Sequence, residues 1–161
     1  MSFEPLYIES WIYATLHDDD TLTDALAAVV GEAPGYQQGV YMHLAPQRDR
    51  VSGKPPAVPY IVVTRAGSGG AYERGLCGDR VLTRPVYNVT VWDSQNGAVA
   101  MDRLITVCDR VDALLDGQGD AGPPIISCWQ VESDAVTEPN QGGEVYYGAV
   151  MVYEFQTQAG A

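Results

Sequence analysis

The chain has 161 residues, 46% of them hydrophobic, and carries a formal net charge of −12 at pH 7. This length and composition fit a single folded domain over 1–161 and exclude wholesale disorder. No run of about 18 apolar residues exists, which excludes a membrane-spanning helix. The acidic balance disfavours tight non-specific binding to nucleic acid because it repels phosphate.

The first thirty residues predict two helices. Pro5 suits the first helical position, and apolar residues follow it in three- and four-residue steps, so a helix is expected over 5–16. Asp20 is expected to cap a short second helix over 22–30. The acidic triplet at 18–20 has no further acids or histidines at metal-loop spacing, and we interpret it as a helix start.

The hydrophobic period then changes to that of strands. β-Branched and aromatic residues predict strands over 39–44, 59–65 and 81–92. Between them, the proline-bearing segment 46–58 and the glycine-rich segment 66–80 are expected to be long flexible loops.

The clearest helix is predicted between a cap at Asn96 or Gly97 and a stop at Gly117. Six apolar residues share one face of this helix: Met101, Leu104, Ile105, Cys108, Val111 and Leu115. Strands over 125–131 and 144–156 complete the order α-α-β-β-β-α-β-β. Long helices are too few for a doubly wound parallel sheet, so the predicted class is α+β, with one antiparallel or mixed sheet of about five strands.

The last predicted strand is apolar on both faces. One face carries Val145, Tyr147, Ala149, Met151, Tyr153 and Phe155, and the other carries Tyr146, Val150 and Val152. An antiparallel strand with one face in water normally alternates apolar and polar residues. The second face is therefore covered either by other parts of the same chain or by another subunit, and the sequence leaves both open.

Charge is distributed unevenly along the chain. Residues 48–84 hold seven of the nine Lys and Arg residues, whereas 1–47 and 113–161 hold acids and no Lys or Arg. This pattern permits contact between the basic middle of one copy and the acidic end of another. The alternative interpretation is that these are solvated loop charges.

No set of residues has the spacing of a catalytic or metal site. His17 and His43 lack a partner at HExxH or HxH spacing, and the serines show no GxSxG pattern. The three cysteines lack CxxC spacing, which argues for a reducing compartment and against a disulfide framework or zinc. We therefore predict no catalytic residues, no cofactor and no metal. An enzyme built on Asp or Cys chemistry is the least favoured hypothesis.

Five segments in order carry a resemblance to the tail-terminator, or tail-completion, proteins of long-tailed bacteriophages. They are HDDDTLTDALAAVVG, GVYMHLAPQ, VPYIVVTRAGSG, RPVYNVTVWDSQNGAVAMDRLITVCDRVDALLDG and EVYYGAVMVYEFQT. Together they cover nearly the whole chain. The loops 46–58 and 66–80 match no pattern of the family.

The resemblance implies a non-enzymatic virion protein, made in the bacterial host cytoplasm and placed in the tail or neck. Such proteins form a ring, typically of six copies, that terminates the tail tube and joins it to the head-side connector or stopper. The implied partners are further copies of the chain, the tail tube protein and that connector. DNA would pass through the lumen without specific binding, and no membrane is involved.

The resemblance also suggests roles for particular residues. The expected subunit-interface or buried-strand residues are Tyr147, Met151 and Tyr153, and the expected partner-contact loop residues are Arg48, Arg50 and Arg74. Two alternatives remain at this point. One is another neck component, a head-closure or head–tail joining protein. The other is a cytoplasmic α+β domain that binds a small molecule on its tyrosine-rich strand.

Overall fold

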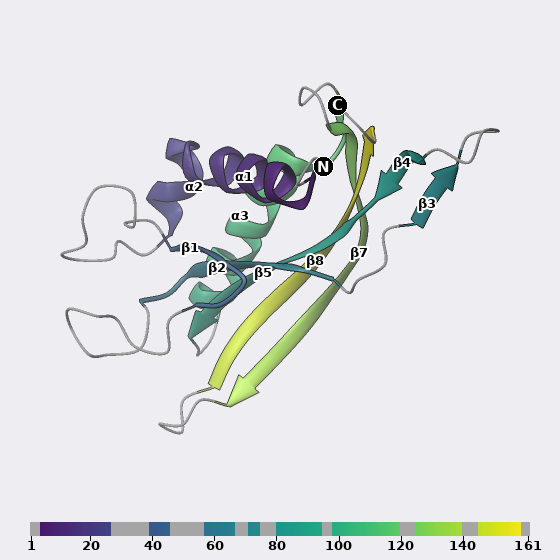
Figure 1. Cartoon of the computed structure of the whole chain (residues 1–161). Coiled ribbons are helices and arrows are strands. Elements are labelled where there is room, and N and C mark those ends of the chain that lie inside the picture. The colour runs from purple at the N-terminus through teal and green to yellow at the C-terminus, as the bar shows by residue number, and fades with distance from the viewer. Residues whose placement is uncertain are drawn as a thin grey trace.

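The computed structural model describes residues 4–26, 39–45, 57–66, 71–74, 80–94, 98–119, 125–139 and 145–158. The helices are α1 (Glu4–His17), α2 (Asp20–Ala25) and α3 (Ala98–Leu115). The strands are β1 (Val40–Met42), β2 (Tyr60–Arg65), β3 (Ala71–Arg74), β4 (Arg80–Arg84), β5 (Val86–Ser94), β6 (Gln118–Gly119), β7 (Ile125–Pro139) and β8 (Val145–Gln158). In these ranges, three helices lie on one side of a mixed eight-stranded sheet (Figure 1), which confirms the predicted α+β class.

Strand β8 is the centre of the sheet. One edge of β8 pairs with β5 and β4, the other edge pairs with β7 along its whole length, and the path from β5 outward is β2 and then β1. Only the β1–β2 pair among these is parallel. The predicted strand 81–92 is two strands, because Pro85 has no N–H for the ladder. Its carbonyl still accepts a bond from the Phe155 N–H, at 2.9 Å.

Several predicted boundaries were wrong. The segment 66–80, expected to be a flexible loop, contains β3, which pairs with β4. The strand predicted over 125–131 continues as β7 to Pro139. Asp19 rather than Asp20 caps α2, and its carboxylate accepts a hydrogen bond from the Leu22 N–H at 2.7 Å. The helix ends at Ala25 instead of continuing to residue 30, because the backbone becomes extended at Leu26. Of the other expected loop, residues 46–56 lie outside the described residues.

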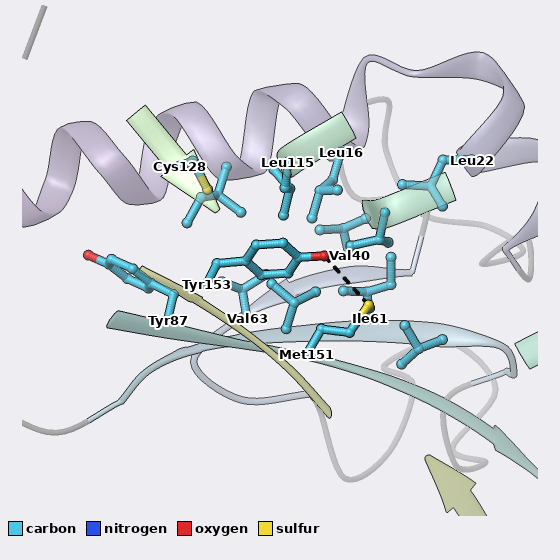
Figure 2. Packing of buried hydrophobic residues seen from close by; sticks show 14 of the residues in the cluster. Leu16, Leu22, Val40, Ile61, Val63, Tyr87, Leu115, Cys128, Met151 and Tyr153 are labelled. Atoms are coloured by element: carbon cyan, nitrogen blue, oxygen red, sulfur yellow. Dashed lines mark hydrogen bonds between the residues drawn. The ribbon is translucent and has the colours of Figure 1, made fainter. Parts of the chain in front are cut away.

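The core lies between the helices and the facing side of the sheet, as Figure 2 shows for residues from α1, α3 and the strands. Helix α1 contributes Ile8, Ile12 and Leu16, which are fully buried, and α3 contributes Leu104, Val107, Val111 and Leu115. Two residues expected on the apolar face of α3, Met101 and Ile105, are about half exposed instead. They lie on the flank of the helix, whereas Val107, absent from the predicted face, is in the core.

The sheet has one covered and one open face. On the covered face of β8, Met151, Tyr153 and Phe155 are buried beneath the helices. On the opposite face Tyr146, Val150 and Val152 are half-buried, and no described helix covers them. The hairpin of β7 and β8 extends so that its tip lies beyond the helices (Figure 1).

No helix in the described segments is both long enough and apolar enough to cross a membrane.

Candidate functional site

The three residues expected on β8 fall into two environments. Tyr153 and Met151 are 0% and 3% exposed, and the Tyr153 hydroxyl donates a hydrogen bond to the Asp112 carboxylate of α3 at 3.1 Å. Figure 2 shows this ring among the core residues, with its hydroxyl 3.6 Å from the Met151 sulfur. Burial and the neighbouring Asp112 raise the pKa of Tyr153. Tyr147, by contrast, is 38% exposed.

The three arginines expected to contact partners are placed differently. Arg48 and Arg50 lie outside the described residues. Arg74 is the last residue of β3 and lies opposite Arg80 of β4 in the register, so it belongs to a hairpin of strands rather than to a loop. The structure therefore does not bring Arg74 next to the residues of β8 named above.

A row of aromatic side chains crosses the open face of the sheet. The rings of Tyr41 on β1 and Tyr60 on β2 meet edge to face, with centroids 5.8 Å apart. Tyr60 lies opposite Trp92 of β5, and Trp92 lies opposite Gly148 of β8. Burial raises the pKa of Tyr60 to about 12, with smaller contributions from Tyr146, Glu138 and Tyr41. No local sequence pattern predicts this row, because its members come from different strands and only the pairing register aligns them.

The outer edge of β7 is a second feature that no sequence pattern predicts. At its base, β6 pairs with Ser127 and Cys128, and the Asp116 carboxylate accepts a bond from the Gln130 N–H at 2.7 Å. Beyond Gln130, the only strand that pairs with β7 in the described part of the chain is β8. We call this segment, Val131–Pro139, the open edge. It carries the acids Glu132, Asp134 and Glu138 and no Lys or Arg.

Two register shifts interrupt the pairing of β7 with β8, one at the start of β7 and one where the open edge begins. They fall between Ile125 and Ser127 and between Gln130 and Glu132. Each leaves one extra residue in β7, and these residues, Ile126 and Val131, are 43% and 50% exposed. Bulges of this kind bend a strand and increase its local twist.

Two bidentate ion pairs fix α3 against its neighbours. The Arg103 guanidinium donates to both carboxylate oxygens of Asp93, at 2.9 and 2.6 Å, and that carboxylate is 1% exposed. The Arg110 guanidinium donates in the same way to Asp19, the cap of α2. The hydrogen bond from Arg110 holds the pKa of Asp19 below its ordinary value. These pairs position the helix layer, and their partners are too far apart in sequence for a local pattern to reveal them.

The described cysteines and histidines form no reactive group. Burial raises the pKa of Cys108 to about 11 and also raises the pKa of Cys128, which is the opposite of what activates a thiol. Cys77 lies outside the described residues. His17 contacts Asp18 at 3.0 Å, and His43 contacts Glu9 at 3.1 Å. Among the residues with assigned positions, no three His, Cys, Asp or Glu side chains form a group that could hold a metal ion.

Comparison with known proteins identifies a shared fold. No protein-family model matches the sequence, and no curated protein matches it. Among solved structures, the chain is similar to a chain of a structure described as the virion of a native gene transfer agent particle. The two share 15% sequence identity, with a TM-score of 0.59, and the likeness covers 92% of each chain. At this identity the likeness establishes the fold.

Proposed function

We propose that this chain is a non-enzymatic structural protein of a virion. In this role it forms a ring, of about six copies, that terminates the phage tail tube and joins the tail to the head–tail connector. The observation that carries the proposal is the likeness over 92% of both chains to a chain of a gene transfer agent virion. The ordered segments that resemble tail-terminator proteins support the finer assignment to the end of the tail.

The sheet offers surfaces that suit repeated contacts between copies. Its face opposite the helices is half-buried and carries tyrosines and valines, and β7 has an open edge. Surfaces of this kind are suited to association rather than to chemistry on a small substrate. In the proposed ring, exposed Tyr147 contributes to a contact between subunits, whereas buried Met151 and Tyr153 stabilise the strand that carries it. Arg48, Arg50 and Arg74 are proposed to contact partner proteins.

Particles assembled without this protein test the proposal. Electron microscopy is expected to show filled heads and separate tails of excessive length, because nothing stops polymerisation of the tube. Heads that leak DNA would instead assign the chain to head closure, the nearest alternative in the neck. Normal particles with joined heads and tails would contradict both assignments.

The ring itself is tested on the purified protein by light scattering over a wide range of concentrations, with and without tail tubes. We expect a discrete species of several subunits, either free or on the tube ends. Tyr147→Ser should weaken this association and should lower the thermal unfolding midpoint less than Met151→Ser does, because Tyr147 is 38% exposed and Met151 is 3% exposed. A protein that stays monomeric at all concentrations and does not bind tubes would contradict the ring.

A further inference from the structure

We propose that the open edge of β7 docks the β3–β4 hairpin of a second copy of this chain. This contact rests on the proposed function, since it specifies how neighbouring copies meet in the ring. The surface is the edge Val131–Pro139 with its three acids, and the occupant is the arginine-bearing hairpin of the next subunit.

The open edge is long and lies in water. At about 3.3 Å per residue it extends for roughly 30 Å, and five consecutive residues from Val131 to Ala135 are exposed. A strand edge with this exposure invites pairing with another chain, and proteins protect such edges with charges and bulges. Here the Asp134 carboxylate accepts a bond from the Ala135 N–H at 2.8 Å, and a bulge lies where the edge begins. These features keep the edge from unselective pairing and place carboxylates where a cationic partner would meet them.

The opposite edge of the same sheet has the complementary charge. On that side of β8 the sheet ends in two strands, β1 beyond β5 and β2, and β3 beyond β4. The only paired neighbour of β3 in the described residues is β4. The described residues of the two strands contain three arginines and one acid, Glu73. Arg74 and Arg80 lie opposite each other in the register, which places two cationic residues at one position along the hairpin. Arg84 at the base of the hairpin is 3.8 Å from Glu154 of its own chain.

One chain cannot supply both halves of this contact. Strand β4 pairs with Thr157 and Gln158 at one end of β8, on one edge, while the far end of β7 pairs with Val145 at the other end, on the other edge. These ends of β8 are about 40 Å apart along the strand. In Figure 1 the β3–β4 hairpin and the tip of the β7–β8 hairpin point away from each other. The complementary surfaces therefore meet between copies.

The two surfaces differ from each other, so the contact is heterologous. A heterologous contact repeated by rotation closes into a ring or continues as a filament, and it leaves no unmatched copy in a closed ring. A two-fold dimer made through either surface alone would instead place like against like, acid against acid or arginine against arginine, which charge repulsion opposes. The charge pattern thus favours head-to-tail association over a two-fold dimer.

Charge reversal on either side provides the test. The first variant, Glu132→Lys with Glu138→Lys, makes the open edge cationic, and the second, Arg74→Glu with Arg80→Glu, makes the hairpin acidic. Each variant alone should associate at least tenfold more weakly than the wild type by light scattering. Mixed in equal amounts, the two should regain association, since each edge then faces a hairpin of opposite charge. The chain that carries all four changes should also associate with itself, and association should weaken as salt rises.

A matched control separates this contact from a general effect of charge. Asp102→Lys with Asp109→Lys changes the net charge by the same amount as the first variant, at exposed positions on α3, and should leave association unchanged. Circular dichroism of every variant should match the wild type.

The outcomes distinguish this proposal from the proposed function. A wild-type assembly that neither variant weakens leaves the ring standing and overturns the contact. Weakening without recovery in the mixture also overturns it, because the edge and the hairpin then act on other surfaces. A wild type that never assembles, even on tail tubes, overturns both.

Discussion

The indole ring of Trp92 lies over Gly148 on the neighbouring strand, so closely that a side chain at Gly148 has no room. A Cβ at this position would be 2.8 Å from Cε3 of Trp92 and 3.0 Å from Cγ2 of Val136. The glycine therefore allows β5 and β7 to bring large side chains together across β8 on the open face of the sheet. This packing holds the aromatic row in place.

Gly148→Ala should lower the free energy of unfolding by about 1–3 kcal/mol, because the added methyl group forces Trp92 or Val136 to move. Urea denaturation followed by circular dichroism measures the change. In the Trp92→Ala background the same substitution should cost less, since the nearest atoms are gone. An equal cost in both backgrounds would show that the indole does not set the limit.

Removing Arg103 should destabilise the fold strongly. The Asp93 carboxylate is 1% exposed, and Arg103→Met leaves it buried without its cationic partner. The expected loss in unfolding free energy is about 1–3 kcal/mol, because the guanidinium of Arg103 is itself 47% exposed and solvent screens the pair. Urea denaturation measures this loss. The free energy of unfolding of Arg103→Lys should lie between those of the wild type and Arg103→Met, because an ammonium group keeps the charge but not the bidentate geometry. The double variant Asp93→Asn with Arg103→Met should recover part of the loss, and no recovery would contradict the ion-pair explanation.

The Asp19–Arg110 pair predicts a dependence of stability on acid. Because the hydrogen bond from Arg110 lowers the pKa of Asp19 in the folded state, folding favours the ionised carboxylate. Its contribution is complete above the ordinary pKa of about 4 and is lost as the pH falls below that value. Asn is also a good helix cap, so Asp19→Asn isolates the ion pair. The stability difference between wild type and this variant should shrink as the pH falls below about 4, and a constant difference would contradict the prediction.

Tyr60 predicts a loss of stability in alkali. Burial raises its pKa in the folded state to about 12, so the phenolate forms first in the unfolded chain. This contribution is complete below the ordinary pKa of about 10 and declines as the pH rises from there toward 12. Comparison with Tyr60→Phe removes the effect of the other tyrosines. The wild type should lose more unfolding free energy between about pH 9 and pH 11 than the variant does. Equal losses would show that Tyr60 titrates normally.

Periodicity in the sequence predicted those elements that bury one face against the same chain. The helix expected over 5–16 is α1, Glu4–His17, and the helix expected before Gly117 is α3, Ala98–Leu115. Their apolar residues repeat at the helical period because the core contacts only one side. The strand β7 was predicted to end near residue 131, because its outer half lies in water and lacks the apolar alternation on which the prediction depends. The short strand β3 was not predicted, because the glycines on both sides of it are typical of a loop.

The residues of the candidate site, like the elements of the fold, were predicted only in part from the sequence. Charge counting indicated a basic middle and acidic ends, and the apolar pattern of β8 indicated a strand with two occupied faces. Neither indicated that Met151 is buried while Tyr147 is exposed, since that depends on how the helices pack over the sheet. The exposure of Met101 and Ile105 has the same cause: a helix buries only the stripe that faces the strands beneath it.

By itself, the sequence determined the α+β class and most of the helices and strands, because these follow from local geometry with a fixed period. Only the tertiary structure decided that Asp93 lies buried against Arg103, that Trp92 covers Gly148, and that the open edge of β7 and the β3–β4 hairpin lie on opposite sides of one sheet. The reason is physical: these relationships join residues on different strands and helices, and pairing register and packing set them rather than any pattern within one segment.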